Sequence, residues 1–271
     1  MKPMVVKFRK YFACARLGYV NRRIFLSEWL EDILYIPFRY GLLLIIWSAI
    51  FKSLGTNVIG GMTRQQLIMY YFMFTVIGSF SSYYRTVSNV LCKDILQGNL
   101  NRFLCRPIKY LSYLFFFGAG YNLYPCILGT VILLAVEIFM MKEFYILSFF
   151  LRILVVLIGV FITFLLHVLI GMIAFWTETI YSFKDLVLHV GSFFSGTLLP
   201  LSMFPGIMNR FSLYMPFRYM TYEPIIAFIQ SPSCSEIGMI LGNQMICTGI
   251  MLVLVWFVWK KGITKYEALG G

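Results

Sequence analysis

The sequence is poor in charged residues, and it lacks the short motifs that mark metal centres. Only 13% of its 271 residues are charged, whereas 60% are hydrophobic and the mean hydropathy is +0.82. This balance excludes an ordinary soluble globular domain. No C-x-x-C pair occurs, and the two histidines, His167 and His189, have no potential ligands at the usual spacing. We therefore expect an integral membrane protein that binds no metal.

Other missing signals exclude further classes of protein. No Gly-Lys dipeptide occurs, so the G-x-x-x-x-G-K-[ST] phosphate loop is absent and the chain cannot hydrolyse ATP by that route. The sequence also lacks H-E-x-x-H and a pair of carboxylates inside an apolar stretch, which a membrane enzyme would need. Because residues 1–30 are repeatedly charged, we expect no cleavable signal peptide. Internal repeats and low-complexity linkers are missing too, which predicts one domain, 1–271.

What the sequence does contain is a series of long apolar stretches. A membrane-spanning helix needs roughly 20 mostly apolar residues. Backbone polar groups in lipid must be satisfied within the segment, and these stretches do not alternate as barrel strands do. We therefore predict an all-α, polytopic fold with six transmembrane helices, at 33–51, 67–84, 111–136, 145–175, 186–203 and 238–259.

The positive charge falls mainly on one side of the membrane that these spans imply. With a cytoplasmic N-terminus, the basic residues outside are only Lys52, Arg64, Lys142, Arg210 and Arg218. The positive-inside rule therefore predicts that both termini are cytoplasmic. The net charge of +12 is then a topological signal, and we expect no nucleic-acid partner. Only Cys234 of the six cysteines is placed clearly outside, which leaves it without an intrachain disulfide partner.

Two segments on the predicted cytoplasmic side combine charge with apolar residues. Residues 1–30 are too polar to span and are typical of an amphipathic helix at the headgroups, although a basic tail that only sets topology remains an alternative. Residues 85–107 carry apolar residues at near-helical spacing, which predicts one or two short amphipathic helices around Gly98. A surface helix without a partner is the alternative for this second segment.

Residues 200–232 match neither a loop nor a span. Five prolines interrupt the segment, yet apolar residues such as Phe204, Phe211 and Phe217 persist through it. Proline frees backbone groups that lipid cannot satisfy, so such a segment is tolerated only where protein or water covers it. We therefore predict short, broken re-entrant helices at the external face.

A few polar or small residues inside the spans are candidates for packing or function. Gly191, Ser192, Ser195 and Gly196 form two small-xxx-small pairs in the fifth span, a spacing that lets helices approach closely. Either a subunit interface or packing against the second span of the same chain explains them. We expect His167 to be a hydrogen-bonded core histidine.

Two arginines lie inside predicted spans, where ionisable groups are costly. We expect Arg152 to extend to the outer surface. We expect Arg39 to reach the cytoplasmic headgroups or to pair with Asp32 or Glu31, with substrate contact as the alternative.

Five sequence elements occur in a fixed order along the chain. They are QGNLNRFLCRPIKY (97–110), AFWTE (174–178), SGTLLPLSMFPG (195–206), PFRYMTYEP (216–224) and the terminal KYEALGG (265–271). In this order the chain resembles the ABC-2 type transporter permeases, the membrane subunits of bacterial ABC exporters. The resemblance covers essentially the whole chain.

The resemblance implies a six-helix permease in the bacterial cytoplasmic membrane. Such a permease pairs with a second identical or related permease and is driven by two ABC ATP-binding subunits, which hold the ATP and Mg²⁺. By this resemblance residues 1–30 are an interfacial helix and 85–107 a coupling helix, with Asp94, Gly98, Leu100 and Arg106 as coupling residues. Gly191, Ser192, Ser195 and Gly196 face the second permease, and 200–232 close the external path through Pro200, Pro205, Phe211 and Pro216.

The apolar, aromatic composition of the chain suits a hydrophobic or amphipathic substrate, in contact with membrane lipids. Two other functions compete with an exporter permease. An intramembrane enzyme acting on lipid or peptide has a similar hydropathy profile but needs a catalytic constellation. A non-catalytic membrane scaffold needs no contact between 85–107 and an ATPase. Copurification with an ATP-binding protein separates the three.

Overall fold

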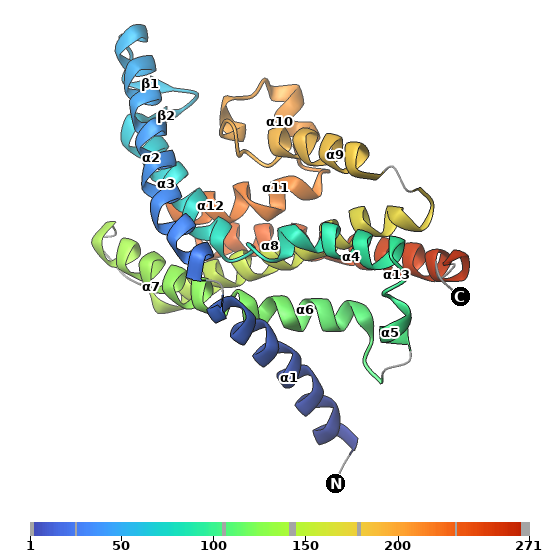
Figure 1. The fold of residues 1–271 in the computed structure, drawn as a ribbon. Helices are drawn as coiled ribbons and strands as arrows, with labels where there is room; N and C mark the ends of the chain where they lie inside the picture. The colour runs from blue at the N-terminus through green and yellow to red at the C-terminus, as the bar shows by residue number, and fades with distance from the viewer. Residues whose placement is uncertain are drawn as a thin grey trace.

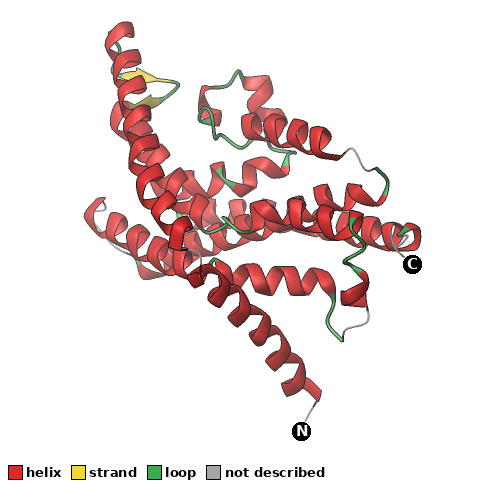
Figure 2. Ribbon diagram, in the orientation of Figure 1, coloured by secondary structure: helices red, strands yellow, loops and turns green. Residues whose placement is uncertain are grey.

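The computed structural model describes residues 3–24, 26–104, 107–140, 145–177, 180–230 and 232–266. This part of the chain is almost entirely helical (Figures 1 and 2). Its α-helices are α1 (Pro3–Ile24), α2 (Leu26–Leu54), α3 (Arg64–Ser79), α4 (Val87–Leu96), α5 (Asn101–Leu104), α6 (Tyr110–Tyr121), α7 (Leu123–Met140), α8 (Ile146–Met172), α9 (Ile180–Phe194), α10 (Gly206–Ser212), α11 (Pro216–Met220), α12 (Tyr222–Ile229) and α13 (Cys234–Lys265). The 3-10 helices are η1 (Tyr84–Thr86), η2 (Ile173–Phe175) and η3 (Leu201–Met203).

A small β-hairpin joins α2 to α3. Strands β1 (Val58–Ile59) and β2 (Met62–Thr63) pair antiparallel around Gly60 and Gly61, both of which have positive φ. Thr63 then begins α3 with a capping box. Its side chain accepts a hydrogen bond from the Gln66 amide, and the Gln66 side chain accepts one from the Thr63 amide. The local sequence therefore fixes the turn between these two helices.

The helices agree with the predicted spans in part. Within the described residues, Ile146–Phe175 and Cys234–Lys265 are long and apolar enough to cross a membrane, and α6 with α7 adds a third crossing if the bent pair is taken as one span. These three correspond to the predicted spans at 145–175, 238–259 and 111–136. The fold is that of a helical membrane protein, and six spans remain a prediction.

The third predicted span is not one straight helix. A bend of 53° separates α6 from α7. Pro125 has no N–H to donate to the Tyr121 carbonyl, and its ring crowds that carbonyl, so the helix breaks just before it. The buried Asn122 at the break accepts hydrogen bonds from the Ser82 hydroxyl at 2.8 Å and the Tyr83 amide at 3.1 Å. The bend therefore packs against the turn that follows α3.

The fifth predicted span, 186–203, is also interrupted. Helix α9 ends at Phe194, and the turn that follows contains Gly196 with φ +75°. Glycine adopts this left-handed conformation without the steric cost that a side chain would add, and it commonly ends helices. Pro200 then prevents the helix from resuming before η3. The stretch therefore contains the later part of the 15-residue helix α9, a turn and η3, not a continuous span.

Helix α8 is the centre of the structure. It packs against α4, α11, α12 and α13 (Figure 1). Two hydrophobic clusters meet along it. One contains Tyr70, Phe80 and Leu201, and the other contains Leu91, Leu114 and Met172, all nearly or fully inaccessible to solvent.

Helix α1 packs against α6 through small residues. A Cβ on Gly120 would lie 1.7 Å from the Ala15 carbonyl oxygen, and one on Gly18 would lie 2.0 Å from that of Phe117. Only glycine therefore permits this contact. The opposite side of α1 exposes Phe12, Leu17, Val20 and Ile24 among basic residues including Arg9, Arg16 and Arg23. This mixture suits a helix at the headgroup level, and the predicted interfacial segment 1–30 divides between α1 and the start of α2.

Candidate functional site

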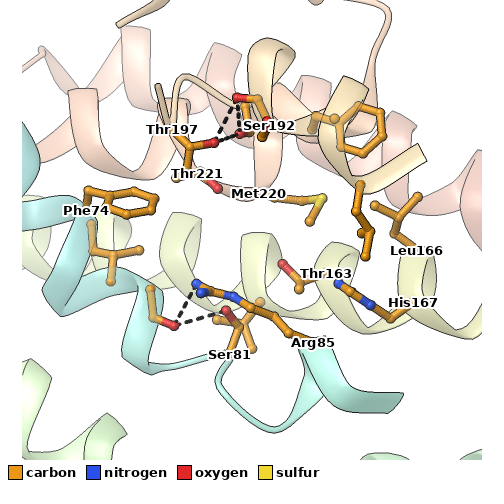
Figure 3. A pocket seen from close by; sticks show the side chains of 17 residues that line it. Phe74, Ser81, Arg85, Thr163, Leu166, His167, Ser192, Thr197, Met220 and Thr221 are labelled. Carbon is orange, nitrogen blue, oxygen red and sulfur yellow. Dashed lines mark hydrogen bonds between the residues drawn. The ribbon is translucent and has the colours of Figure 1, made fainter. Parts of the chain in front are cut away.

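A pocket of about 200 Å³ lies between α3, η1, α8, α9 and α11 (Figure 3). Residues far apart in the sequence come together there. Arg85 and Ser81 lie on one side, Thr163 and His167 come from α8, and Ser192 and Thr197 lie opposite (Figure 3). Apolar residues complete the lining: Phe74, Ile77, Val160, Leu166, Leu188, Phe217 and Met220. The pocket is thus apolar with a few convergent polar groups, as ligand sites commonly are.

The cationic wall of the pocket is built on the end of α3. The Arg85 guanidinium donates a hydrogen bond to the Gly78 carbonyl at 2.9 Å. A Cβ on Gly78 would lie 2.9 Å from the same guanidinium nitrogen, so glycine makes room for this contact. The Ser81 hydroxyl donates to the same carbonyl at 3.2 Å. The arginine is therefore held against α3 while its side chain stays exposed.

The α8 wall contributes His167 and Thr163. His167 is 4% exposed, and its Nδ1 lies 3.2 Å from the Ser88 hydroxyl of α4. The prediction of a hydrogen-bonded core histidine is confirmed, and the structure adds that the ring also lines the pocket. The Thr163 hydroxyl donates to the Gly159 carbonyl at 2.9 Å, within its own helix. Because the hydroxyl uses its hydrogen in this bond, its acceptor lone pairs and the threonine methyl remain for a ligand.

The third wall is formed by the end of α9. The Ser192 carbonyl accepts hydrogen bonds from the Ser195 hydroxyl at 3.0 Å and the Thr197 hydroxyl at 2.8 Å, and these two hydroxyls also contact each other. Figure 3 shows this cluster opposite Arg85. The hydrogen bonds hold the irregular chain after α9 in a fixed conformation.

The four small residues predicted at a subunit interface make contacts inside the chain. A Cβ on Gly191 would lie 2.2 Å from the Phe217 ring of α11, and one on Gly196 would lie 2.5 Å from the Tyr70 hydroxyl. That hydroxyl donates to the Gly196 carbonyl at 2.8 Å. Because Tyr70 lies on α3, the Gly196 contact agrees with the alternative of packing against the second span. Gly191, Ser192 and Ser195 line the pocket.

The segment predicted to couple to an ATPase forms η1, α4 and α5. Asp94 on α4 accepts a hydrogen bond from the Tyr110 hydroxyl at 2.5 Å, and Gly98 ends the helix region with φ +72°. Leu100 is 0% exposed, so its side chain anchors the segment to the chain's interior and offers no surface to a partner. Arg106 lies outside the described residues. The described residues of this segment that are exposed are Arg85, Thr86, Asn89, Lys93, Gln97, Asn101, Arg102 and Pro107.

Residues 200–232 form η3, α10, α11 and α12, so the chain here is broken into short helices. Pro200 and Pro205 directly precede η3 and α10, and Pro216 is the first residue of α11, positions that need no N–H from proline. Phe211 is half exposed, and its ring contacts Phe194 of α9 with centroids 5.6 Å apart.

An ion pair holds these short helices together. Arg218 pairs with Glu223 at 2.5 Å and donates to the Asn209 side chain at 2.7 Å. This one guanidinium therefore connects α10, α11 and α12.

A second ion pair was not predicted from the sequence. Arg152 on α8 is 3% exposed and pairs with Glu137 on α7 at 2.9 Å, and it also donates to Ser148 at 3.0 Å. The prediction that Arg152 extends to the outer surface is wrong, because a buried carboxylate and hydroxyl satisfy its guanidinium inside the protein. The sequence did contain a signal for this pair, because Glu137 carries the opposite charge and lies on the preceding helix, 15 positions before Arg152.

The other titratable groups that the structure describes form no metal centre. Within the described ranges, no three His, Cys, Asp or Glu side chains lie close enough together to hold a metal ion.

A search of curated proteins finds no significant match. A family model described as ABC-2 family transporter protein matches residues 38–270, which include all of the pocket and the segments around it. The chain therefore belongs to the ABC-2 transporter family.

Proposed function

We propose that this chain is the permease subunit of an ATP-driven exporter, and that its substrate passes through the pocket between α3, α8, α9 and α11. The family consists of membrane subunits that are not themselves the ATPase, and it implies ABC ATP-binding partner subunits in general. ATP and Mg²⁺ would then bind to that partner. The mixed lining of the pocket is the observation that carries the proposal.

The chemistry of the lining favours an amphipathic substrate. Phe74, Phe217 and Met220 offer apolar and polarisable surface, while Arg85 supplies the positive charge. Ser192 and Thr197 supply hydroxyls opposite that charge (Figure 3). An apolar molecule that carries one anionic or strongly polar group would satisfy both parts of the lining.

The connection between pocket and α4 supports a coupling role for residues 85–107. Arg85 lies in η1, directly before α4, and Val87, Leu91 and Ile95 are buried in the packing of α4. The Tyr110–Asp94 hydrogen bond ties α4 to the start of α6. An ATPase that docks on the exposed residues Lys93, Gln97 and Arg102 would therefore move a rigid element that ends at the pocket.

The proposal also covers the topology, the second permease and the external gate. Six spans would place both termini in the cytoplasm, with the chain in the bacterial cytoplasmic membrane. A second, identical or related, permease would complete the path, against α9 and the exposed face of α2. Residues 200–232 would lie at the external end, where Pro200, Pro205, Phe211 and Pro216 shape the gate.

An intramembrane enzyme is the alternative, and one contact bears on it. The Ser88 hydroxyl and His167 imidazole lie 3.2 Å apart, a spacing that also suits a nucleophile and its base. Ser88 is 1% exposed and is not among the residues that line the pocket. A substrate in the pocket would not reach its hydroxyl, which favours the permease.

The test is transport by the purified complex in proteoliposomes. We would copurify the ATP-binding partner, then measure ATP-driven accumulation of fluorescent amphipathic anions inside these proteoliposomes. Ser192→Trp fills the pocket, so we expect transport to fall at least tenfold while copurification and ATP hydrolysis persist. Thr264→Trp, at the exposed end of α13, is the matched control and should transport normally. Wild-type transport by Ser192→Trp, or failure of any ATP-binding protein to copurify, would contradict the proposal.

A further inference from the structure

A second and larger hollow lies away from the pocket, between α1, the start of α6 and the last turns of α13. Its volume is about 910 Å³. Lys10 and Tyr11 contribute from α1, Lys109 and Tyr110 from the start of α6, and Leu252, Val255, Trp256 and Trp259 from α13. The substrate path proposed above does not pass through this groove, although Phe103 and Tyr110 in its lining adjoin the coupling segment.

The groove is positively charged at its rim. Lys10 and Lys109 are 99 positions apart in the sequence, yet both line it. The Lys260 ammonium lies 5.4 Å from the centre of the Trp256 ring, and Trp256 also lines the groove. The described residues that line the groove include no carboxylate. An anionic group would therefore find two lysines in the lining without a competing acid.

The rest of the groove is aromatic and apolar. Trp256 is 63% exposed, and the Tyr110 ring stacks on Trp259 with centroids 6.2 Å apart and an interplanar angle of 13°. Leu252 and Val255 line the groove one turn deeper along α13. Tryptophan and tyrosine prefer the headgroup level of a membrane, where one end of the ring is apolar and the other wet. The groove thus changes from charged to apolar along α13, as a lipid does along its length.

We propose that this groove binds an anionic phospholipid of the cytoplasmic leaflet, with its phosphate between Lys10 and Lys109 and an acyl chain along Leu252 and Val255. Basic pockets between helices on the cytoplasmic side attract such headgroups. A free phosphate ion would satisfy the lysines but would leave the tryptophan and aliphatic surface exposed. The apolar part of the lining therefore favours a lipid as the occupant.

The bound lipid would also touch the segment proposed to couple to the ATPase. Phe103 and Tyr110 both line the groove, and their rings lie 4.8 Å apart, edge to face. The Tyr110 hydroxyl in turn holds Asp94 of α4. A lipid in the groove therefore stabilises the connection between α4 and α6. Lipid binding itself does not depend on the transport function.

The test uses the full chain in detergent and two double variants of equal charge. Lys10→Gln with Lys109→Gln removes the charges of the groove. Lys52→Gln with Arg210→Gln removes two exposed charges on α2 and α10 and is the control. Native mass spectrometry counts retained lipids, and the thermal unfolding midpoint is measured with added phosphatidylglycerol, phosphatidylcholine or inorganic phosphate.

We expect phosphatidylglycerol to raise the unfolding midpoint and to bind the wild type and the control alike. In the groove variant its affinity should fall about thirtyfold, since each of the two lysines near a headgroup contributes about 1 kcal/mol and 1.4 kcal/mol is about a factor of ten. Trp256→Ala should weaken lipid binding without changing any response to phosphate. Equal affinity for phosphatidylcholine, an unchanged groove variant, or an equal stabilisation by inorganic phosphate would each overturn the proposal.

Discussion

Among the described residues, the helices α8 and α13 are each long and apolar enough to cross a membrane, and they lie side by side but have different surroundings (Figure 1). In the most apolar stretch of α8, 61% of residues are buried within the chain, against 22% for α13. Helix α8 is enclosed by four other helices, whereas α13 buries one narrow face. Apolar composition alone therefore does not tell whether a span faces protein or lipid.

The buried face of α13 follows helical spacing. Ile237, Gln244, Thr248, Met251 and Val255 recur at intervals of three, four or seven, and all are buried. Exposed apolar residues occupy the other faces: Met239, Met245, Ile246, Ile250, Val253 and Trp256. A large exposed apolar surface on a membrane helix suits lipid tails or a second subunit. Substitutions in α8 should therefore lower the stability strongly, whereas in α13 only substitutions on the buried face should lower it.

The largest expected effect is the loss of one member of the buried ion pair. Arg152→Ala leaves Glu137 buried and uncompensated, which should lower the free energy of unfolding by about 3–5 kcal/mol. This free energy of unfolding is measured by SDS titration in mixed micelles. Lys261→Ala, at the exposed end of α13, should change it by less than about 0.5 kcal/mol. The double replacement Glu137→Leu with Arg152→Met should be milder than Arg152→Ala, and a more severe result would show that the pair does not act as a unit.

Two glycines offer a second comparison, in which replacement by alanine should lower the stability at one site and raise it at the other. A Cβ on Gly159 of α8 would lie 2.9 Å from the Tyr219 carbonyl oxygen, so Gly159→Ala should cost about 1–3 kcal/mol of stability through overpacking. Gly249 of α13 has nothing within 4 Å, so Gly249→Ala should gain about 0.5–1 kcal/mol from helix propensity. The same SDS titration applies. Equal effects at the two sites would refute the contrast between the helices.

The smallest expected effect is a difference in stability between substitutions at two neighbouring residues of α13. The Gln244 amide donates to the carbonyls of Val155 at 3.0 Å and Tyr219 at 3.1 Å, so Gln244→Leu should cost about 1 kcal/mol. Asn243 is exposed, and Asn243→Leu should leave the unfolding midpoint nearly unchanged. Thermal unfolding in the same detergent compares them. If Asn243→Leu destabilised the protein as much, α13 would be rotated relative to its described position.

Several local features could be predicted because they depend on neighbouring residues only. The prolines after residue 200 break the chain into short helices, and Gly98 ends a helix, as their backbone preferences require. The bend before Pro125 had the same kind of signal in the sequence, and the prediction of one transmembrane helix at 111–136 did not use it. Pro200 and Gly196 likewise marked the early end of the fifth span.

The residues of the candidate site could not be predicted from the sequence in the same way. Arg85, His167 and Ser192 come from three separate parts of the chain, and nothing in their local sequence signals that they share a pocket. Gly191 and Gly196 were identified as close-packing residues, but their neighbours, Phe217 and Tyr70, depend on how whole helices dock. Leu100 has the spacing of an amphipathic helix, and only its complete burial shows that it faces the interior.

The sequence by itself determined that this protein is a helical membrane protein of the ABC-2 family, and where proline and glycine interrupt its helices. Composition and backbone preference act on each residue regardless of distant contacts, so they can be read along the chain. The tertiary structure alone decided that Arg152 pairs with Glu137, that α8 is enclosed while α13 is exposed, and that two lysines 99 positions apart share one groove. These outcomes depend on the packing of helices against one another, which hydropathy does not specify because lipid and protein interior are nearly equally apolar.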